Sequence, residues 1–154
     1  MKCGCILSPW WVVKVLAGLS LVAQLGLDVW WNWGTLFESS QWAAQLTVGL
    51  GFVLVCWHYV LLKGSTRDIS RPQSLVTQGG LYGLVRHPMY LGDLVVILGL
   101  GLMVPTVFSV LVVGLSWVAL LRLSRFEDNL MAHRFPDQFE AYSQSTRRVI
   151  PFLH

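Results

Sequence analysis

The fold is decided by residues 86–122, which read RHPMYLGDLVVILGLGLMVPTVFSVLVVGLSWVALLR. This stretch contains two apolar segments, residues 88–104 and 106–121, on either side of Pro105. Each segment has 16 or 17 residues, which corresponds to about 25 Å at the helical rise. Because the segments are joined by a tight turn, we predict one antiparallel helical hairpin, short for the full thickness of a bilayer.

Two longer apolar segments precede the hairpin, at residues 10–31 and 42–62. Each has the ~20 residues that are needed to span ~30 Å of hydrocarbon. Hydrophobic residues make up 55% of the chain and charged residues 12%, whereas a soluble domain carries about 25% charged residues. We therefore predict an all-α, multi-pass membrane protein. Residues 1–154 form a single domain with four transmembrane helices, the last two being the short hairpin.

The start of the chain also fits a signal peptide, because Met1 and Lys2 precede an apolar run. Lys14 interrupts that run, however, and the segment is long enough to cross a membrane. We therefore favour a retained membrane span.

The basic residues set the expected orientation. Ten of the 11 Lys and Arg residues lie at the N-terminus, between segments two and three, or after segment four. The positive-inside rule then places both termini and the 63–87 loop in the cytoplasm. The membrane is a bacterial inner membrane or, in a eukaryote, the endoplasmic reticulum. The basic residues flank apolar segments, so we expect the bilayer as their partner and no nucleic acid.

A polar helical pattern continues beyond the hairpin. An apolar stripe persists as far as Met131, Pro136 interrupts it, and residues 137–145 form a second short helix. The chain then continues as an extended segment, residues 147–151. We expect these C-terminal helices to lie in the cytoplasm. Cys3, Cys5 and Cys56 match no zinc-site spacing, so we expect no metal.

A first cluster of polar residues lies at the start of the hairpin, in residues 77–90. Proline suits the first helical position and keeps the residue before it out of the helix, so His87 is the predicted N-cap. The free amides of such a helix end, together with Arg86, could hold a carboxylate. The alternative is a membrane anchor with an interfacial tyrosine, and the residues alone favour it.

A second cluster of the opposite charge follows the hairpin, where Glu127 and Asp128 are adjacent. A carboxylate there could bind ribose hydroxyls, a ligand ammonium group or Arg86. The alternative is a solvated ion pair with Arg125 or Arg134, which contributes well under ~1 kcal/mol.

Together the two clusters resemble the isoprenylcysteine carboxyl methyltransferases and the phospholipid N-methyltransferases. The matching motifs are Leu-Val-Thr-Gln-Gly at residues 75–79 and Tyr82, then Arg-His-Pro-Met-Tyr-Leu-Gly at residues 86–92. After the hairpin come the acidic pair at 127–128, the aromatic residues Phe139 and Tyr142, and a closing Arg148 and Pro151. The chain departs from the family pattern at three places: Asp128 replaces a glutamate, Pro136 a glycine, and Thr-Arg at 146–147 a Val-Pro pair.

The resemblance implies a cofactor-binding methyltransferase core in residues 75–151, with S-adenosylmethionine as the cofactor. The residues implied to bind the cofactor are Tyr82, His87, Tyr90, Glu127 and Asp128. The residues implied to act in catalysis are Arg148, Glu127 and Arg86. Because the Asp128 side chain is the shorter, we weight Glu127 above it.

The implied reaction transfers a methyl group to a lipidic or lipid-linked small molecule, as isoprenylcysteine carboxyl methyltransferases do. A carboxylate acceptor would be oriented by Arg148, and Glu127 would keep Arg148 in place or contact the cofactor. An amine acceptor would need a base, Glu127 or His87. Phospholipid or small-thiol methylation, an NADPH-dependent membrane reductase and a non-catalytic membrane adapter are the alternatives. Four helices enclose little volume, and a homodimer is one way to complete the substrate site.

Overall fold

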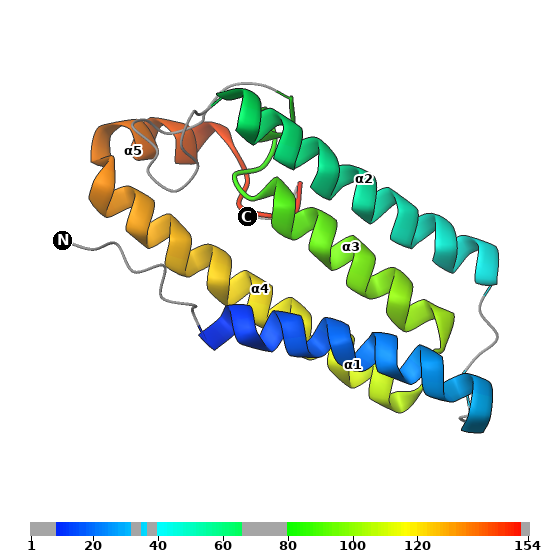
Figure 1. The fold of residues 1–154 in the computed structure, drawn as a ribbon. Helices are drawn as coiled ribbons and strands as arrows, with labels where there is room; N and C mark the ends of the chain where they lie inside the picture. The colour runs from blue at the N-terminus through cyan, green and yellow to red at the C-terminus, as the bar shows by residue number, and fades with distance from the viewer. Residues whose placement is uncertain (1–8, 32–34, 37–39, 66–79, 152–154) are drawn as a thin grey trace.

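The computed structural model describes residues 9–31, 35–36, 40–65 and 80–151. The elements are five helices, α1 (Pro9–Trp31), α2 (Gln41–Ser65), α3 (Pro88–Met103), α4 (Val107–Arg134) and α5 (Pro136–Ser145), and a 3-10 turn η1 (Gly80–Gly83). Helices α1 to α4 run alternately up and down, and α5 folds back at the end of α4 (Figure 1). The all-α prediction is confirmed for this part of the chain.

The predicted hairpin is present, and its helices begin where the local sequence indicates. Helix α3 has His87 as its N-cap and Pro88 in its first turn. At the other end, the Thr106 side chain caps α4 by accepting a hydrogen bond from the Ser109 N–H. Helix α4 then continues without interruption to Arg134, and Pro136 begins α5. The polar tail is therefore partly a continuation of the apolar helix.

Two helices, α2 and α4, are long and apolar enough to cross a membrane by length and composition. Helix α3 and residues 15–28 of α1 are apolar but shorter in the described part of the chain. Large apolar side chains are exposed on both long helices, for example Leu46 and Leu111. The four-span topology therefore has support from two helices and stays a prediction for the other two.

Helix α3 packs more extensively against α2 than against its hairpin partner α4. The reason is a row of glycines in the α2–α3 interface, Gly51, Gly92 and Gly99. A Cβ atom on Gly51 would lie 2.6 Å from the backbone nitrogen of Val96, and one on Gly99 would lie 2.7 Å from that of Val48. Backbones that approach this closely form tight helix pairs in membranes.

Replacing Gly99 by valine should therefore weaken the α2–α3 interface. The new side chain would overlap backbone atoms, which cannot move independently of their helix, and overpacking costs about 1–3 kcal/mol. Thermal unfolding in detergent should show a lower midpoint for Gly99→Val. The matched control is Gly114→Val, because a Cβ on Gly114 meets no atom within 4 Å. Equal midpoints for the two variants would contradict the close-packing argument.

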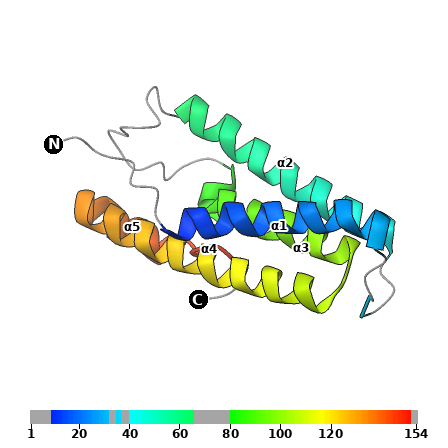
Figure 2. The same ribbon diagram turned by 60° about the horizontal axis from the view of Figure 1, so that its bottom comes forward.

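Helix α1 belongs to the bundle although its sequence resembles nothing in the family pattern. Figure 2 shows α1 in front of α3 and running alongside α4, which is its main partner. Leu21 joins the buried core that contains Tyr90. The Gln24 side chain donates to the Thr106 hydroxyl at 2.8 Å and accepts from the Ser109 hydroxyl at 3.0 Å. Helix α1 is thus tied to the α3–α4 turn and supports the helices that carry the polar clusters.

Candidate active site

A short backbone pairing joins the two polar clusters. Residues 84–87 lie parallel to residues 147–148, with a β-bridge between Val85 and Arg147. The N–H of Arg86 donates to the carbonyl of Arg147 at 2.7 Å, and the N–H of His87 donates to that of Arg148 at 3.0 Å. In Figure 1 the C-terminal segment runs back from α5 to the start of α3. The predicted extended segment therefore delivers Arg148 to the His87 end of α3.

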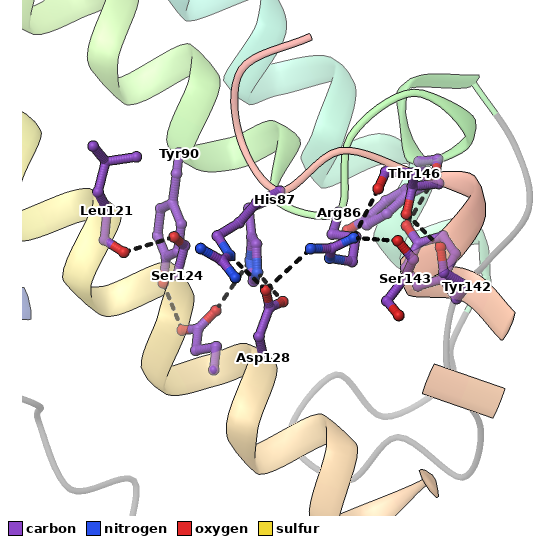
Figure 3. Close-up of polar contacts among 12 residues, drawn as sticks. Arg86, His87, Tyr90, Leu121, Ser124, Asp128, Tyr142, Ser143 and Thr146 are labelled. Carbon is purple, nitrogen blue, oxygen red and sulfur yellow. Dashed lines mark hydrogen bonds and ion pairs between the residues drawn. The ribbon is translucent and has the colours of Figure 1, made fainter. Parts of the chain in front are cut away.

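Asp128 lies at the centre of the charged groups. Its carboxylate accepts hydrogen bonds from His87 Nε2 at 2.8 Å and from Arg148 Nε at 2.8 Å, and it pairs with Arg86 at 3.4 Å. Its side chain is only 7% exposed. Arg86 is held further by the carbonyls of Ser143 and Thr146, at 3.1 and 2.8 Å (Figure 3). Asp128 therefore holds three basic side chains from two chain segments.

These contacts decide between the readings that the sequence left open. A solvated pairing of Asp128 with Arg125 or Arg134 is wrong, because Asp128 is buried and contacts Arg86 and Arg148 instead. Of the two roles expected for Glu127, holding Arg148 is not seen, because Asp128 makes that contact. The shorter side chain of Asp128 projects directly towards the C-terminal segment. The other role of Glu127, a contact with the cofactor, stays a prediction.

The charges around Asp128 shift its pKa and that of His87. Asp128 lies about two turns beyond the apolar part of α4. Burial raises the pKa of Asp128, but hydrogen bonds from His87 and Arg148 outweigh burial and lower the pKa to about 2. Burial lowers the pKa of His87, but hydrogen bonds to Asp128 and Glu127 outweigh burial and raise that pKa above its ordinary 6.5. The geometry therefore favours a protonated His87 against two carboxylates.

Glu127 lies beside this cluster and is more accessible. Its Oε1 accepts a hydrogen bond from the Tyr90 hydroxyl at 2.5 Å, and its Oε2 lies 3.5 Å from His87 Nδ1. The His87 and Tyr90 rings stack with centroids 5.4 Å apart. The side chain of Glu127 is 39% exposed, against 7% for Asp128. Of the adjacent carboxylates, Glu127 is the one that a ligand can reach.

Tyr82 lies next to the cluster but directs its hydroxyl elsewhere. The hydroxyl is 3.0 Å from Nδ1 of His58 on α2, and both side chains are buried. The Tyr82 carbonyl accepts from the Tyr142 hydroxyl at 2.9 Å. Burial, followed by the charge of Glu127, raises the pKa of Tyr82 to about 12, so the phenol remains protonated. A cofactor contact by Tyr82 would have to involve atoms other than the paired hydroxyl.

We expect Tyr82→Phe to destabilise the protein by about 1–2 kcal/mol, because Nδ1 of the buried His58 would lose its partner. A lower thermal midpoint in detergent is the measurement. The control is a double-mutant cycle: once His58→Phe has removed the histidine, adding Tyr82→Phe should cost little. An unchanged cost in that background would show that the two side chains do not interact.

The structure thus brings six of the seven implied site residues into one cluster and leaves Tyr82 at its edge. The six are Arg86, His87, Tyr90, Glu127, Asp128 and Arg148. Two contributions were missed from sequence: the pair formed by His58, and the carbonyls that hold Arg86. The position of His58 in an apolar helix was a sequence signal for the first contribution. The carbonyls that hold Arg86 belong to the backbone and have no sequence signal. No group of three or more acidic, His or Cys side chains in the described ranges could hold a metal ion.

The comparisons with known proteins agree with the family resemblance. Residues 39–138 match the phospholipid methyltransferase family. A relative from Alcaligenes xylosoxydans xylosoxydans, the nickel-cobalt-cadmium resistance protein NccN, is 33% identical over 74% of this chain and 56% of its own length. The cobalt-zinc-cadmium resistance protein CzcN of Cupriavidus metallidurans is 31% identical over 73% of this chain and 52% of its own length.

The chain therefore spans about half the length of these curated relatives. No solved structure matches it significantly. The family match covers α2, α3, α4 and the start of α5, including five of the six clustered residues, and stops before Arg148. Since it covers more than half of the chain, this protein belongs to the phospholipid methyltransferase family.

Proposed function

We propose that the protein transfers a methyl group from S-adenosylmethionine to a lipidic or membrane-associated acceptor at the cytoplasmic face of a membrane. The observation that carries the proposal is the accessible Glu127 in contact with Tyr90 and His87, with Arg148 on the adjacent Asp128, within a chain of a methyltransferase family. An isoprenylcysteine-like carboxylate is the acceptor that we favour. Phospholipid amines and small thiols are the other acceptors.

The residues present fit the amino-acid end of the cofactor, which carries a carboxylate and an ammonium group. The Nε–H of Arg148 donates to Asp128, yet the Arg148 side chain is 40% exposed and can bind an anion. The Glu127 carboxylate is similarly exposed and can meet a cation. Among the described residues, the buried Nε–H of Arg86 has no hydrogen-bond acceptor. Exposed groups of opposite sign, together with an unsatisfied N–H, suit a zwitterionic ligand.

When bound, S-adenosylmethionine supplies an activated methyl group on its sulfonium centre, so that the protein mainly has to position two reactants. Asp128 and Arg86 are committed to protein partners: we assign Asp128 the task of holding His87 and Arg148 in place, and Arg86 that of tying Asp128 to the segment after α5. Glu127, with Tyr90 and His87, binds the cofactor. Arg148 orients a carboxylate, whereas an amine or thiol acceptor would pass its proton to Glu127.

The membrane placement is part of the same proposal. In this proposal both termini and the 63–87 loop face the cytoplasm, in an inner membrane or in the endoplasmic reticulum; the two ends of the chain and residues 66–79 lie outside the described residues. The exposed apolar side chains of α2 and α4 support burial of these helices in lipid. A second copy of the chain could complete the substrate site.

Ligand binding to the detergent-purified protein tests the proposed function. We expect calorimetry to detect S-adenosylhomocysteine, the product form of the cofactor, and no NADPH. Binding of NADPH alone would indicate a reductase. Binding of neither ligand would indicate a membrane adapter without catalysis.

A further inference from the structure

Beyond the apolar part of α4, one exposed face of the helix combines basic and apolar side chains. Arg122 and Arg125 are exposed there, and so are Phe126 and Leu130, by 50% and 48% of their surface. The spacing of three to four residues places all four on one side of the helix. Adjacent exposed apolar side chains beside charged residues are typical of a surface that binds a partner or a membrane.

The same side of the helix faces outward throughout the apolar part of α4. Leu111, Leu115 and Val118 are exposed there, and steps of four, three and four residues lead from Leu111 to Arg122. The buried side of the helix includes Asp128, which binds the residues of the candidate active site. The helix therefore has a site side and an outer side, and the outer side continues the surface that we assign to lipid.

The length of α4 places this face at the edge of the membrane. Its 28 residues extend about 42 Å at the helical rise, which exceeds the ~30 Å of a hydrocarbon core. If α4 starts at one boundary of that core, the stretch from Arg122 to Leu130 lies about 22–35 Å further along. This interval contains the opposite boundary and the adjoining headgroup layer.

Charge complementarity identifies the partner. Within the part of the chain that the structure describes, Arg122 and Arg125 form no ion pair, and the nearby Asp128 is already paired with three basic groups. Guanidinium groups bind phosphate oxygens through two parallel hydrogen bonds, and cytoplasmic leaflets carry anionic lipids. Phe126 and Leu130 can enter the layer below the phosphates.

We propose that Arg122, Arg125, Phe126 and Leu130 form a binding surface for anionic phospholipid headgroups, which holds the cytoplasmic end of α4 in the headgroup layer. The surface rests on the membrane placement proposed above but not on methyl transfer. It keeps the candidate active site, on the other side of the same helix, at the depth of the lipid headgroups.

Native mass spectrometry of the detergent-purified full chain, with equal amounts of phosphatidylglycerol and phosphatidylcholine, tests this surface. We expect the protein to prefer phosphatidylglycerol. Each arginine should contribute about 5-fold to that preference, so that the double variant Arg122→Gln/Arg125→Gln loses most of it. The matched control is Arg134→Gln, which changes an exposed arginine in the last turn of α4, about 6 Å beyond Leu130 at the helical rise and outside the proposed surface. This control should keep the preference.

Three results would overturn the proposal: no preference in the wild type, an unchanged preference in the double variant, or an equal loss in the Arg134→Gln control. Both arginines are exposed, so the double variant should unfold at the wild-type temperature. Flotation with pure phosphatidylcholine vesicles tests the membrane placement separately from the lipid-binding surface. Failure to float would overturn the membrane placement and this surface together, whereas flotation without a preference for phosphatidylglycerol would overturn the surface alone.

Discussion

Replacing Asp128 by asparagine should lower the free energy of unfolding by about 3 kcal/mol, at the low end of the cost of breaking a buried ion pair. The amide would leave His87, Arg86 and Arg148 without their shared carboxylate. We choose the low end because Arg148 is 40% exposed, and water replaces part of that contact. Thermal unfolding in detergent is the measurement. Limited proteolysis should also cut the C-terminal segment sooner, because Arg148 would be released from α4.

The matched control is Asp137→Asn, which removes an exposed carboxylate from α5. This control should unfold like the wild type and keep its C-terminal segment protected. If Asp128→Asn unfolded at the same temperature as Asp137→Asn, Asp128 would not be the residue that holds the two segments together.

The same ion pairs predict how stability depends on pH. The pKa of His87 is raised in the folded protein. Its contribution to stability is therefore complete below pH 6.5 and is lost as the pH rises through the pKa of the folded state. The pKa of Asp128 is lowered, so its contribution is complete above 3.8 and is lost as pH falls towards about 2. The temperature of the unfolding midpoint should therefore decrease as the pH rises above 6.5. Asp128→Asn should flatten this fall, and an equally steep fall in that variant would contradict the assignment.

The helices could be predicted from sequence because their signals are local. Pro88 after His87 fixed the start of α3, and continuous apolar runs indicated α2 and α4. The partners of these helices were not predictable in the same way. The α2–α3 contact depends on Gly51 meeting Val96, and a glycine within an apolar run does not indicate which helix it faces.

The composition of the candidate site was accessible from sequence, but its internal contacts were not. The motifs around Arg86 and Glu127 identified the residues through family resemblance. Arg148 is held by Asp128 rather than by Glu127 because residues 84–87 pair with residues 147–148 through the backbone. These two stretches are about 60 residues apart in sequence. Such pairing has no periodicity, and two short extended stretches could pair with many others. The structure therefore supplied the division between a buried and an accessible carboxylate.

This division makes Glu127→Gln the sharpest test of ligand binding. The glutamine oxygen can still accept the hydrogen bond from Tyr90, and the lost pairing with His87 is long, at 3.5 Å, and partly exposed. The variant should therefore unfold close to the wild-type temperature. Loss of the negative charge should cost a charge-assisted hydrogen bond to the ligand, about 1.5–3 kcal/mol. Calorimetry should therefore show S-adenosylhomocysteine binding that is weaker by roughly 10- to 150-fold.

Glu140→Gln is the control for Glu127→Gln, because it removes an exposed carboxylate of α5 outside the cluster. It should leave the affinity unchanged. Wild-type affinity in Glu127→Gln would remove Glu127 from the binding site. Asp128→Asn and Glu127→Gln together distinguish a role in stability from a role in ligand binding. Asp128→Asn should lose stability together with binding, because it loosens the support of His87 and Arg148. Glu127→Gln should lose mainly binding, because the one ion pair that it loses within the described residues, with His87, is long and partly exposed.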